Sequence, residues 1–171
     1  SAAQAPRRQI VAQKIFDVTG IPSLTTSTAV LSALEASGIG KLFLITPYPD
    51  DINEHEVGFL NHYGIQVAGT DSFRCPTSEA IRQVSSAQVA ALALGHAQAI
   101  RNSDGLFLSC TNLLTMDQIA FLEGELGKPV ISSNQASLWA ILQHMGIDTA
   151  SIPAGSLFGK KGDIPVAGRA M

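Results

Sequence analysis

Residues 105–110 read GLFLSC, a short apolar run that ends in a serine and a cysteine. Two further runs of the same kind are KLFLIT at 41–46 and PVISS at 129–133, and residues 65–68 are also strand-like. Short apolar runs without a clear alternation of polar residues are typical of strands that are buried on both faces. The sequence therefore predicts a parallel sheet that is covered by helices on both sides.

Segments with helical character separate these runs. The expected helices span residues 6–18, 27–38, 50–63, 85–100, 115–126 and 134–145. Ser27 or Thr28 would cap the second helix, and Ser85 or Ser86 would open the fourth. Helices and strands that alternate and are joined by right-handed crossovers form a doubly wound α/β sandwich with Rossmann-like architecture.

Composition limits the classes of protein and of partner. The chain has 171 residues, of which 46% are hydrophobic and 15% are charged. The charged fraction is low beside the usual quarter or so, which favours a homo-oligomer. A net charge of −3 argues against nucleic acid as a partner, and no apolar run reaches the roughly 18 residues of a membrane span. With two cysteines and no signal-peptide pattern at residues 1–10, we expect a cytoplasmic protein.

The residues that follow each strand are the candidates for a ligand site, because ligands of open parallel sheets bind beyond the carboxyl ends of the strands. These residues are rich in hydroxyl and amide groups and poor in charge: Thr46, Tyr48, Asp71, Ser72, Cys110, Thr111, Asn112 and residues 132–135, with residues 25–28 before the second helix. Neutral donors and helix N-termini suit a small carboxylate. The set lacks the His and Asp clusters of a metal site, so no metal is expected.

Cys110 is the sharpest feature of this set. A cysteine between a strand end and a helix lies near positive backbone dipoles, which favour a reactive thiolate. The alternative is a small buried core residue, a frequent role of cysteine. Tyr48 also has two interpretations, since it could pack as a turn residue or direct its hydroxyl into the cleft. Cys75 is interpreted as an incidental loop thiol.

A resemblance to a known family is carried by LFLSCTNLLT at 106–115 and GKPVISSNQASLWAIL at 127–142. Supporting stretches are TGIPSLTTSTAVLSAL, LITPYPDDINE and EAIRQVSS, at residues 19–34, 44–54 and 79–86. In this order they resemble the aspartate/glutamate racemase superfamily, and within it the branch of maleate cis-trans isomerases and arylmalonate decarboxylases. The decarboxylases typically have glycines after the cysteine, where this chain has Thr111 and Asn112, so the resemblance favours the isomerases.

The resemblance implies two similar α/β lobes with the active site between them. Residues 24–146 would form the lobe that carries the strand-end cysteine. Residues 1–23 would form a helix that links it to an N-terminal lobe not contained in these residues, and residues 147–171 would form an arm that packs on that other lobe. The upstream lobe of the isomerases contains a first cysteine, in a Cys-Thr-Ser type motif, that attacks the double bond.

The resemblance also assigns roles to particular residues. Cys110 matches the second-lobe cysteine, and Tyr48 matches a tyrosine that touches a substrate carboxylate. Thr111 and Asn112 would supply donors just after the thiol. Ser78 stands where the isomerases usually have an asparagine, and the rim residue Thr46 completes the expected substrate-binding set.

These features predict a cofactor-independent isomerase that acts on a small dicarboxylate, in the manner of a maleate isomerase, with Cys110 as acid/base thiol. The alternatives are an arylmalonate decarboxylase-like lyase, an aspartate/glutamate-type racemase and an inactive carboxylate-binding domain. Fold alone does not choose between these classes.

Overall fold

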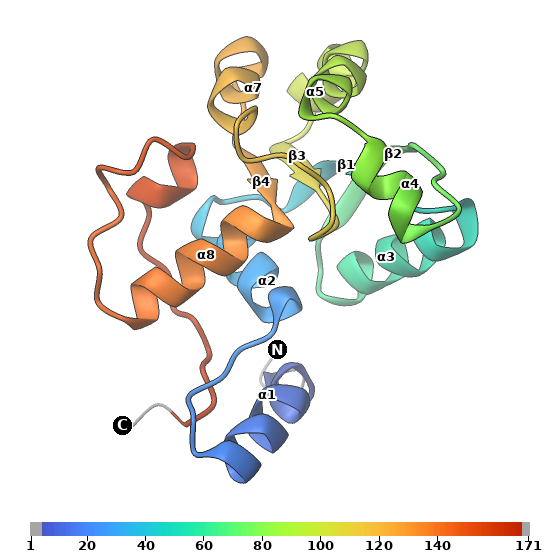
Figure 1. Ribbon diagram of the computed structural model, residues 1–171. Coiled ribbons are helices and arrows are strands. Elements are labelled where there is room, and N and C mark those ends of the chain that lie inside the picture. Colours follow the sequence, from blue (N-terminus) through green and yellow to red (C-terminus); the bar gives the residue numbers. More distant parts are fainter. Residues whose placement is uncertain (1–4, 169–171) are drawn as a thin grey trace.

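The computed structural model describes residues 5–168 and contains a four-stranded parallel sheet (Figure 1). The strand order is β2-β1-β3-β4, with all three neighbouring pairs parallel. The strands are β1 (Lys41–Thr46), β2 (Gln66–Ser72), β3 (Gly105–Leu108) and β4 (Val130–Ser132). The doubly wound α/β architecture predicted from the apolar runs is confirmed.

Helices cover both faces of the sheet, as Figure 1 shows. One face carries α2 (Thr26–Ala36), α3 (Asp50–His62) and α8 (Ser133–His144). The other carries α4 (Ser78–Gln83), α5 (Ser86–Gly95), α6 (Ala97–Arg101) and α7 (Ile119–Leu126). The helix α1 (Ala5–Thr19) lies beyond α2, away from the sheet. No helix within residues 5–168 is both long and apolar enough to cross a membrane.

Alternation along the buried strands creates two separate cores. In β1, Leu42 and Leu44 join the cluster under α2 and α8, whereas Phe43 and Ile45 join the cluster under α5 and α7. Because successive side chains of a strand point to opposite faces, a run without polar residues supplies both cores at once. The apolar runs therefore place the sheet in the centre of the molecule.

Several element boundaries differ from the sequence-based expectation. Thr25, and not Ser27 or Thr28, caps α2, because its hydroxyl accepts the Thr28 N–H. The expected helix over 85–100 breaks at His96 into α5 and α6, and α4 precedes it as a short helix that was not expected. Ser85 does cap α5 in a capping box.

The boundaries around the sheet also differ from expectation. Strand β2 runs to Ser72, beyond the expected end at residue 68. Helix α7 begins at Ile119 and not at Thr115, since Thr115 precedes a turn.

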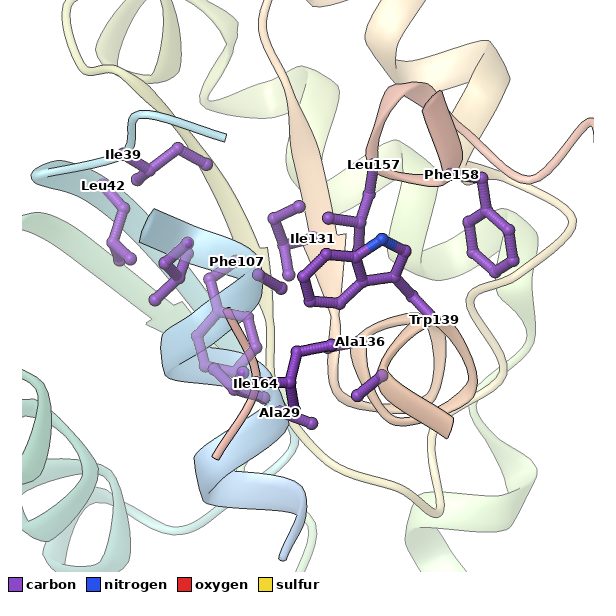
Figure 2. Packing of buried hydrophobic residues seen from close by; sticks show 14 of the residues in the cluster. Ala29, Ile39, Leu42, Phe107, Ile131, Ala136, Trp139, Leu157, Phe158 and Ile164 are labelled. Atoms are coloured by element: carbon purple, nitrogen blue, oxygen red, sulfur yellow. The ribbon is translucent and has the colours of Figure 1, made fainter. Parts of the chain in front are cut away.

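The segment after α8 packs against the lobe that precedes it. Trp139 is fully buried beside Leu157 and Phe158, and its indole N–H donates to the Lys160 carbonyl at 3.2 Å (Figure 2). The backbone at Gly162 passes so close to this ring that an added Cβ would lie 2.5 Å from it. Contact between this segment and another lobe stays a prediction.

Large apolar side chains remain exposed on α1 and α8. Val18 is 86% exposed, and Ile21 after α1 and Met145 after α8 are each 64% exposed. These exposed apolar side chains agree with the low fraction of charged residues. That the protein forms a homo-oligomer stays a prediction.

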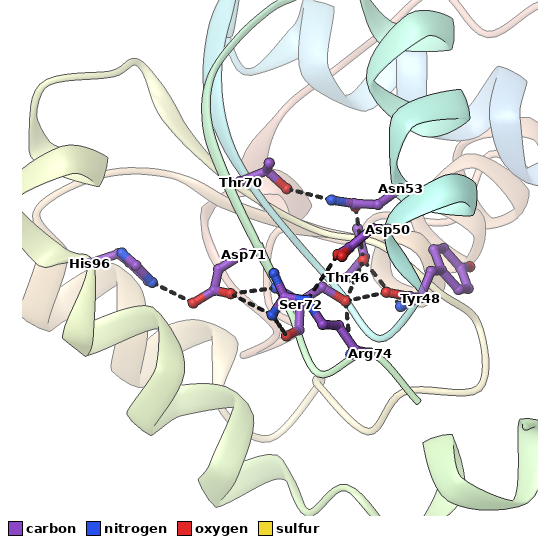
Figure 3. Close-up of polar contacts among 9 residues, drawn as sticks. All are labelled: Thr46, Tyr48, Asp50, Asn53, Thr70, Asp71, Ser72, Arg74 and His96. Atoms are coloured by element: carbon purple, nitrogen blue, oxygen red, sulfur yellow. Dashed lines mark hydrogen bonds and ion pairs between the residues drawn. The ribbon is translucent and has the colours of Figure 1, made fainter. Parts of the chain in front are cut away.

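The pair formed by His96 and Asp71 links β2 to the break between α5 and α6. His96 stacks on Phe43 with ring centroids 4.8 Å apart, and its Nε2 lies 2.7 Å from Asp71 Oδ2 (Figure 3). Burial favours the neutral form of Asp71, but hydrogen bonds with His96 and the Ser72 N–H and the charge of Arg74 hold its pKa below the usual value.

The lowered pKa of Asp71 predicts a pH-dependent contribution to stability. A lowered pKa means that the carboxylate stabilises the folded state above the ordinary pKa of Asp, and that this contribution is lost as pH falls through the lowered value. We expect Asp71→Asn to decrease the free energy of unfolding by about 1 kcal/mol near neutral pH and to have no effect in strong acid. Thermal unfolding of both proteins at the two pH values measures this, and an equal difference at both would contradict it.

Candidate active site

A pocket of about 370 Å³ opens at the carboxyl ends of β1 and β3. It is lined by Thr26, Ser27, Val30, Tyr48, Glu56, Phe59, Phe107, Ser109, Cys110, Thr111 and Ser133. Polar groups come from the loops after β1 and β3, from the first turns of α2 and α8 and from α3, while Val30, Phe59 and Phe107 form an apolar wall. The pocket therefore lies where ligands of parallel α/β sheets bind.

Cys110 is held in a strained backbone conformation at the base of this pocket. The backbone φ of Cys110 is 114°, in a region that residues other than glycine rarely adopt. The residue is buried, with 8% of its surface exposed. Its N–H donates to Ser133 Oγ at 3.1 Å, and its Sγ accepts the Asn112 N–H at 3.3 Å. Strain of this kind persists where surrounding contacts enforce it, and it is frequent at functional sites.

Tyr48 is half-buried, and its hydroxyl interacts with the site. Burial raises the pKa of Tyr48 well above its usual range, and the hydrogen bond and electrostatic interaction with Cys110 and the electrostatic interaction with Glu56 raise it further, against a hydrogen bond with Ser109 that lowers it. The phenol therefore stays protonated and can donate a hydrogen bond to an anion. Of the two sequence interpretations, the structure agrees with a hydroxyl directed into the cleft.

A hydrogen-bond network behind the pocket fixes the turn that carries Tyr48 (Figure 3). Thr46 Oγ1 lies 3.0 Å from Asn53 Oδ1 and 3.3 Å from Ser72 Oγ, and it accepts the Tyr48 N–H at 3.2 Å. The Ser72 hydroxyl in turn donates to the Tyr48 carbonyl. Thr46 is fully buried in this network and does not line the pocket, so it acts on the site through the position of Tyr48.

Two helix N-termini contribute to the pocket. Thr25 caps α2, and Ser132 caps α8 in a capping box with Gln135. The first N–H groups of a helix lack intrahelical partners and carry partial positive charge. The pocket thus offers several neutral donors to an anion, and its lining contains no Lys, Arg or His.

The remaining residues of the expected set lie in different places. Thr111 lines the pocket, whereas Asn112 is exposed and reaches Cys110 through its backbone N–H. Ser78 is exposed at the start of α4, apart from the residues that line the pocket. Catalysis by Cys110 stays a prediction, as does substrate binding by Tyr48, Thr111, Asn112, Thr46 and Ser78. Within residues 5–168, no three His, Cys, Asp or Glu side chains gather as metal ligands would.

Glu56 is a pocket residue that the sequence interpretation missed. Its Oε1 accepts the Ser109 hydroxyl at 2.7 Å, and burial raises its pKa above the usual value. The signal was available in helical spacing, since Asn53, Glu56 and Leu60 recur at intervals of three and four on the buried side of α3. A carboxylate in such a stripe faces the interior of the protein.

The parallel α/β sheet, the strained cysteine at a strand end and the donor-rich pocket beside it agree with the resemblance to the aspartate/glutamate racemase superfamily. The sequence profile of the arylmalonate decarboxylase family matches residues 6–158. The chain belongs to this family.

Individual relatives agree with this placement. The chain is 38% identical over 143 residues to the arylmalonate decarboxylase of Bordetella bronchiseptica. The aligned region covers 83% of this chain and 60% of that protein. A solved structure of unliganded arylmalonate decarboxylase superposes with a TM-score of 0.79 at 35% identity, covering 90% of this chain and 67% of that one.

A more distant neighbour is a maleate cis-trans isomerase. The Nocardia farcinica enzyme, solved with a covalently bound succinylcysteine intermediate, has a TM-score of 0.78 at 19% identity over 88% of this chain and 63% of that one. At this identity the likeness shows the fold alone. The chain spans about 60% of the length of the Bordetella protein, and the named relatives are enzymes that break a carbon–carbon bond or isomerise maleate.

Proposed function

We propose that this chain carries the thiol half of a cofactor-independent active site, and that the reaction is decarboxylation of a malonate with an apolar substituent. The observation that carries the proposal is the pocket itself, whose lining combines Cys110, a set of neutral donors and the apolar side chains Val30, Phe59 and Phe107. Maleate has no apolar group for that wall, whereas an aryl substituent would pack on Phe59 and Phe107. The 38% identity to a decarboxylase supports the same choice.

The reaction would proceed in two steps. The Tyr48 hydroxyl and the first N–H groups of α2 and α8 would hold one carboxylate, while the bond from the central carbon to the other carboxylate breaks and carbon dioxide leaves. The electron pair of that bond would pass into an enediolate. The Cys110 S–H would then give its proton to the carbon, and solvent would restore the proton on sulfur. The Asn112 N–H would stabilise the intermediate thiolate.

Product analysis tests this proposal. The full-length protein would be incubated with phenylmalonate, maleate and aspartate in turn. We expect carbon dioxide and phenylacetate from the first compound and no change in the other two. Turnover of aspartate with loss of chirality would instead identify a racemase.

Maleate isomerisation is the second candidate, and Thr111 and Asn112 favour it because hydroxyl and amide groups follow the thiol where the decarboxylases typically have glycines. A cysteine outside these residues would attack the double bond, the bond would rotate, and the adduct would collapse to fumarate. Formation of fumarate from maleate, without release of carbon dioxide from phenylmalonate, would select this reaction.

Tyr48→Phe tests the role of the phenol. Removal of one donor to a developing negative charge typically decreases turnover by about 100-fold or more. We expect that decrease in kcat/KM for phenylmalonate with little change in stability, since the contact of Ser72 with the Tyr48 backbone remains. Tyr63→Phe, outside the pocket lining, is the control, and similar losses in the two variants would contradict the assignment.

A further inference from the structure

Glu56 is the ionisable carboxyl group in the lining of the pocket. It lies on α3 and faces Ser109 and Cys110 of the loop after β3 and Tyr48 of the loop after β1. The Ser109 hydroxyl donates to its Oε1 at 2.7 Å, which fixes the carboxyl group at the wall of the pocket. Glu56 and Cys110 therefore line the same pocket, so a substrate bound beside Cys110 shares that pocket with Glu56.

The charge environment of Glu56 is unusual for a pocket that is suited to anions. The titratable groups that face it are Tyr48 and Cys110, which are neutral or negative. The lining from α2 and α8 consists of Thr26, Ser27, Val30 and Ser133, none of which titrates. Among residues 5–168, the lining of this pocket therefore holds no cation that would neutralise an ionised Glu56 beside a substrate carboxylate.

Two carboxyl groups in contact without a cation cannot both remain ionised, and they share one proton. A protonated Glu56 would donate to a substrate carboxylate, while an ionised Glu56 would repel it. Burial already moves the group towards the protonated form, because it raises the pKa of Glu56.

We propose that Glu56 is a specificity-determining residue that admits a dicarboxylate together with one proton, by donating a hydrogen bond to the carboxylate that Tyr48 does not hold. This inference rests on the proposed function, since it assumes a dicarboxylate in the same pocket. A monocarboxylate held by Tyr48 and the helix N-termini needs no such proton. Dicarboxylate binding should therefore weaken as pH rises, and monocarboxylate binding should not.

The test measures the dissociation constants of phenylmalonate and phenylacetate by calorimetry, between about pH 5 and pH 8. The full-length protein with Cys110→Ala is used, so that phenylmalonate is not consumed. Above the pKa of Glu56, we expect the dissociation constant of phenylmalonate to rise about tenfold per pH unit, with no such slope for phenylacetate.

Three variants in this background separate charge from structure. Glu56→Gln keeps an acceptor for Ser109 and a donor for substrate, so phenylmalonate binding should stay tight and lose its pH slope. Ser109→Ala removes a hydrogen bond that favours the ionised carboxylate, so the decline should begin at higher pH. Glu54→Gln removes an exposed charge from the same helix and should leave the profile unchanged.

The outcomes distinguish this inference from the proposed function. A flat profile for phenylmalonate, or an unchanged slope in Glu56→Gln, overturns the role of Glu56 even if the protein releases carbon dioxide. A proton-linked profile in a protein without decarboxylase activity sustains the role of Glu56 and overturns the reaction. If phenylmalonate does not bind at any pH, the role of Glu56 and the proposed decarboxylation are both overturned.

Discussion

Cys110→Ala should decrease turnover of phenylmalonate by at least about 1000-fold while the protein stays folded. The thiol is the group that we propose delivers the proton to carbon, whereas Tyr48 and Glu56, the other titratable side chains of the lining, are assigned to the substrate carboxylates. The measurement is the rate of carbon dioxide release by the full-length protein, with circular dichroism as the check on folding.

The control for this variant is the other cysteine. Cys75 is also buried, and its thiol is free. Burial is the main cause that raises the pKa of this thiol, and the electrostatic interaction with Cys110 raises it further. It packs in the core cluster under α5 and α7 and does not line the pocket. Cys75→Ala should therefore keep most of the activity, and equal losses in the two variants would remove Cys110 from its assigned role.

A third variant tests the backbone strain. At a φ of 114°, alanine retains the strain and glycine relieves it. Both substitutions remove the same sulfur, so Cys110→Gly should be more stable than Cys110→Ala by about 1 kcal/mol, although both are inactive. Urea unfolding of the pair measures this difference, and a more stable alanine variant would show that the conformation is unstrained.

Trp139→Ala should decrease the free energy of unfolding by about 3–5 kcal/mol. The ring is fully buried, it lies against residues 157–162 after α8, and its N–H is bonded to Lys160. Its loss would leave a cavity and remove one of the two side-chain hydrogen bonds to the Lys160 carbonyl, the other being from Gln143 of α8. Urea unfolding followed by far-ultraviolet circular dichroism is the measurement, because the chain has one tryptophan and the variant has none.

Two further variants calibrate that result. Trp139→Phe keeps most of the packing and loses the hydrogen bond, so its effect should be smaller than that of alanine. Leu138→Ala changes the adjacent residue of α8, which is 41% exposed, and should alter stability by about 1 kcal/mol or less. A loss for Leu138→Ala equal to that for Trp139→Ala would mean that the buried contacts of Trp139 are not the source of its effect.

Local pattern was sufficient for the sheet and for the position of the thiol. A run such as residues 41–46 has too few polar groups to face water on either side, so it had to be a buried strand. Caps were harder to predict, because residues 25–28 are four consecutive hydroxyl residues and each is a competent cap. The break at His96 was not predictable, since it coincides with contacts to Phe43 and Asp71 from distant strands.

The sequence by itself determined the α/β sandwich and the place of Cys110 at a strand end, because these depend on hydrophobic pattern and strand length. Tertiary structure alone decided which side chains meet the thiol. Ser109 and Glu56 lie 53 positions apart in the chain and 2.7 Å apart in space, and the buried Thr46 hydroxyl accepts the Tyr48 N–H. Such encounters depend on strand order and on the face that each helix buries, and neither is encoded in the residues next to the site.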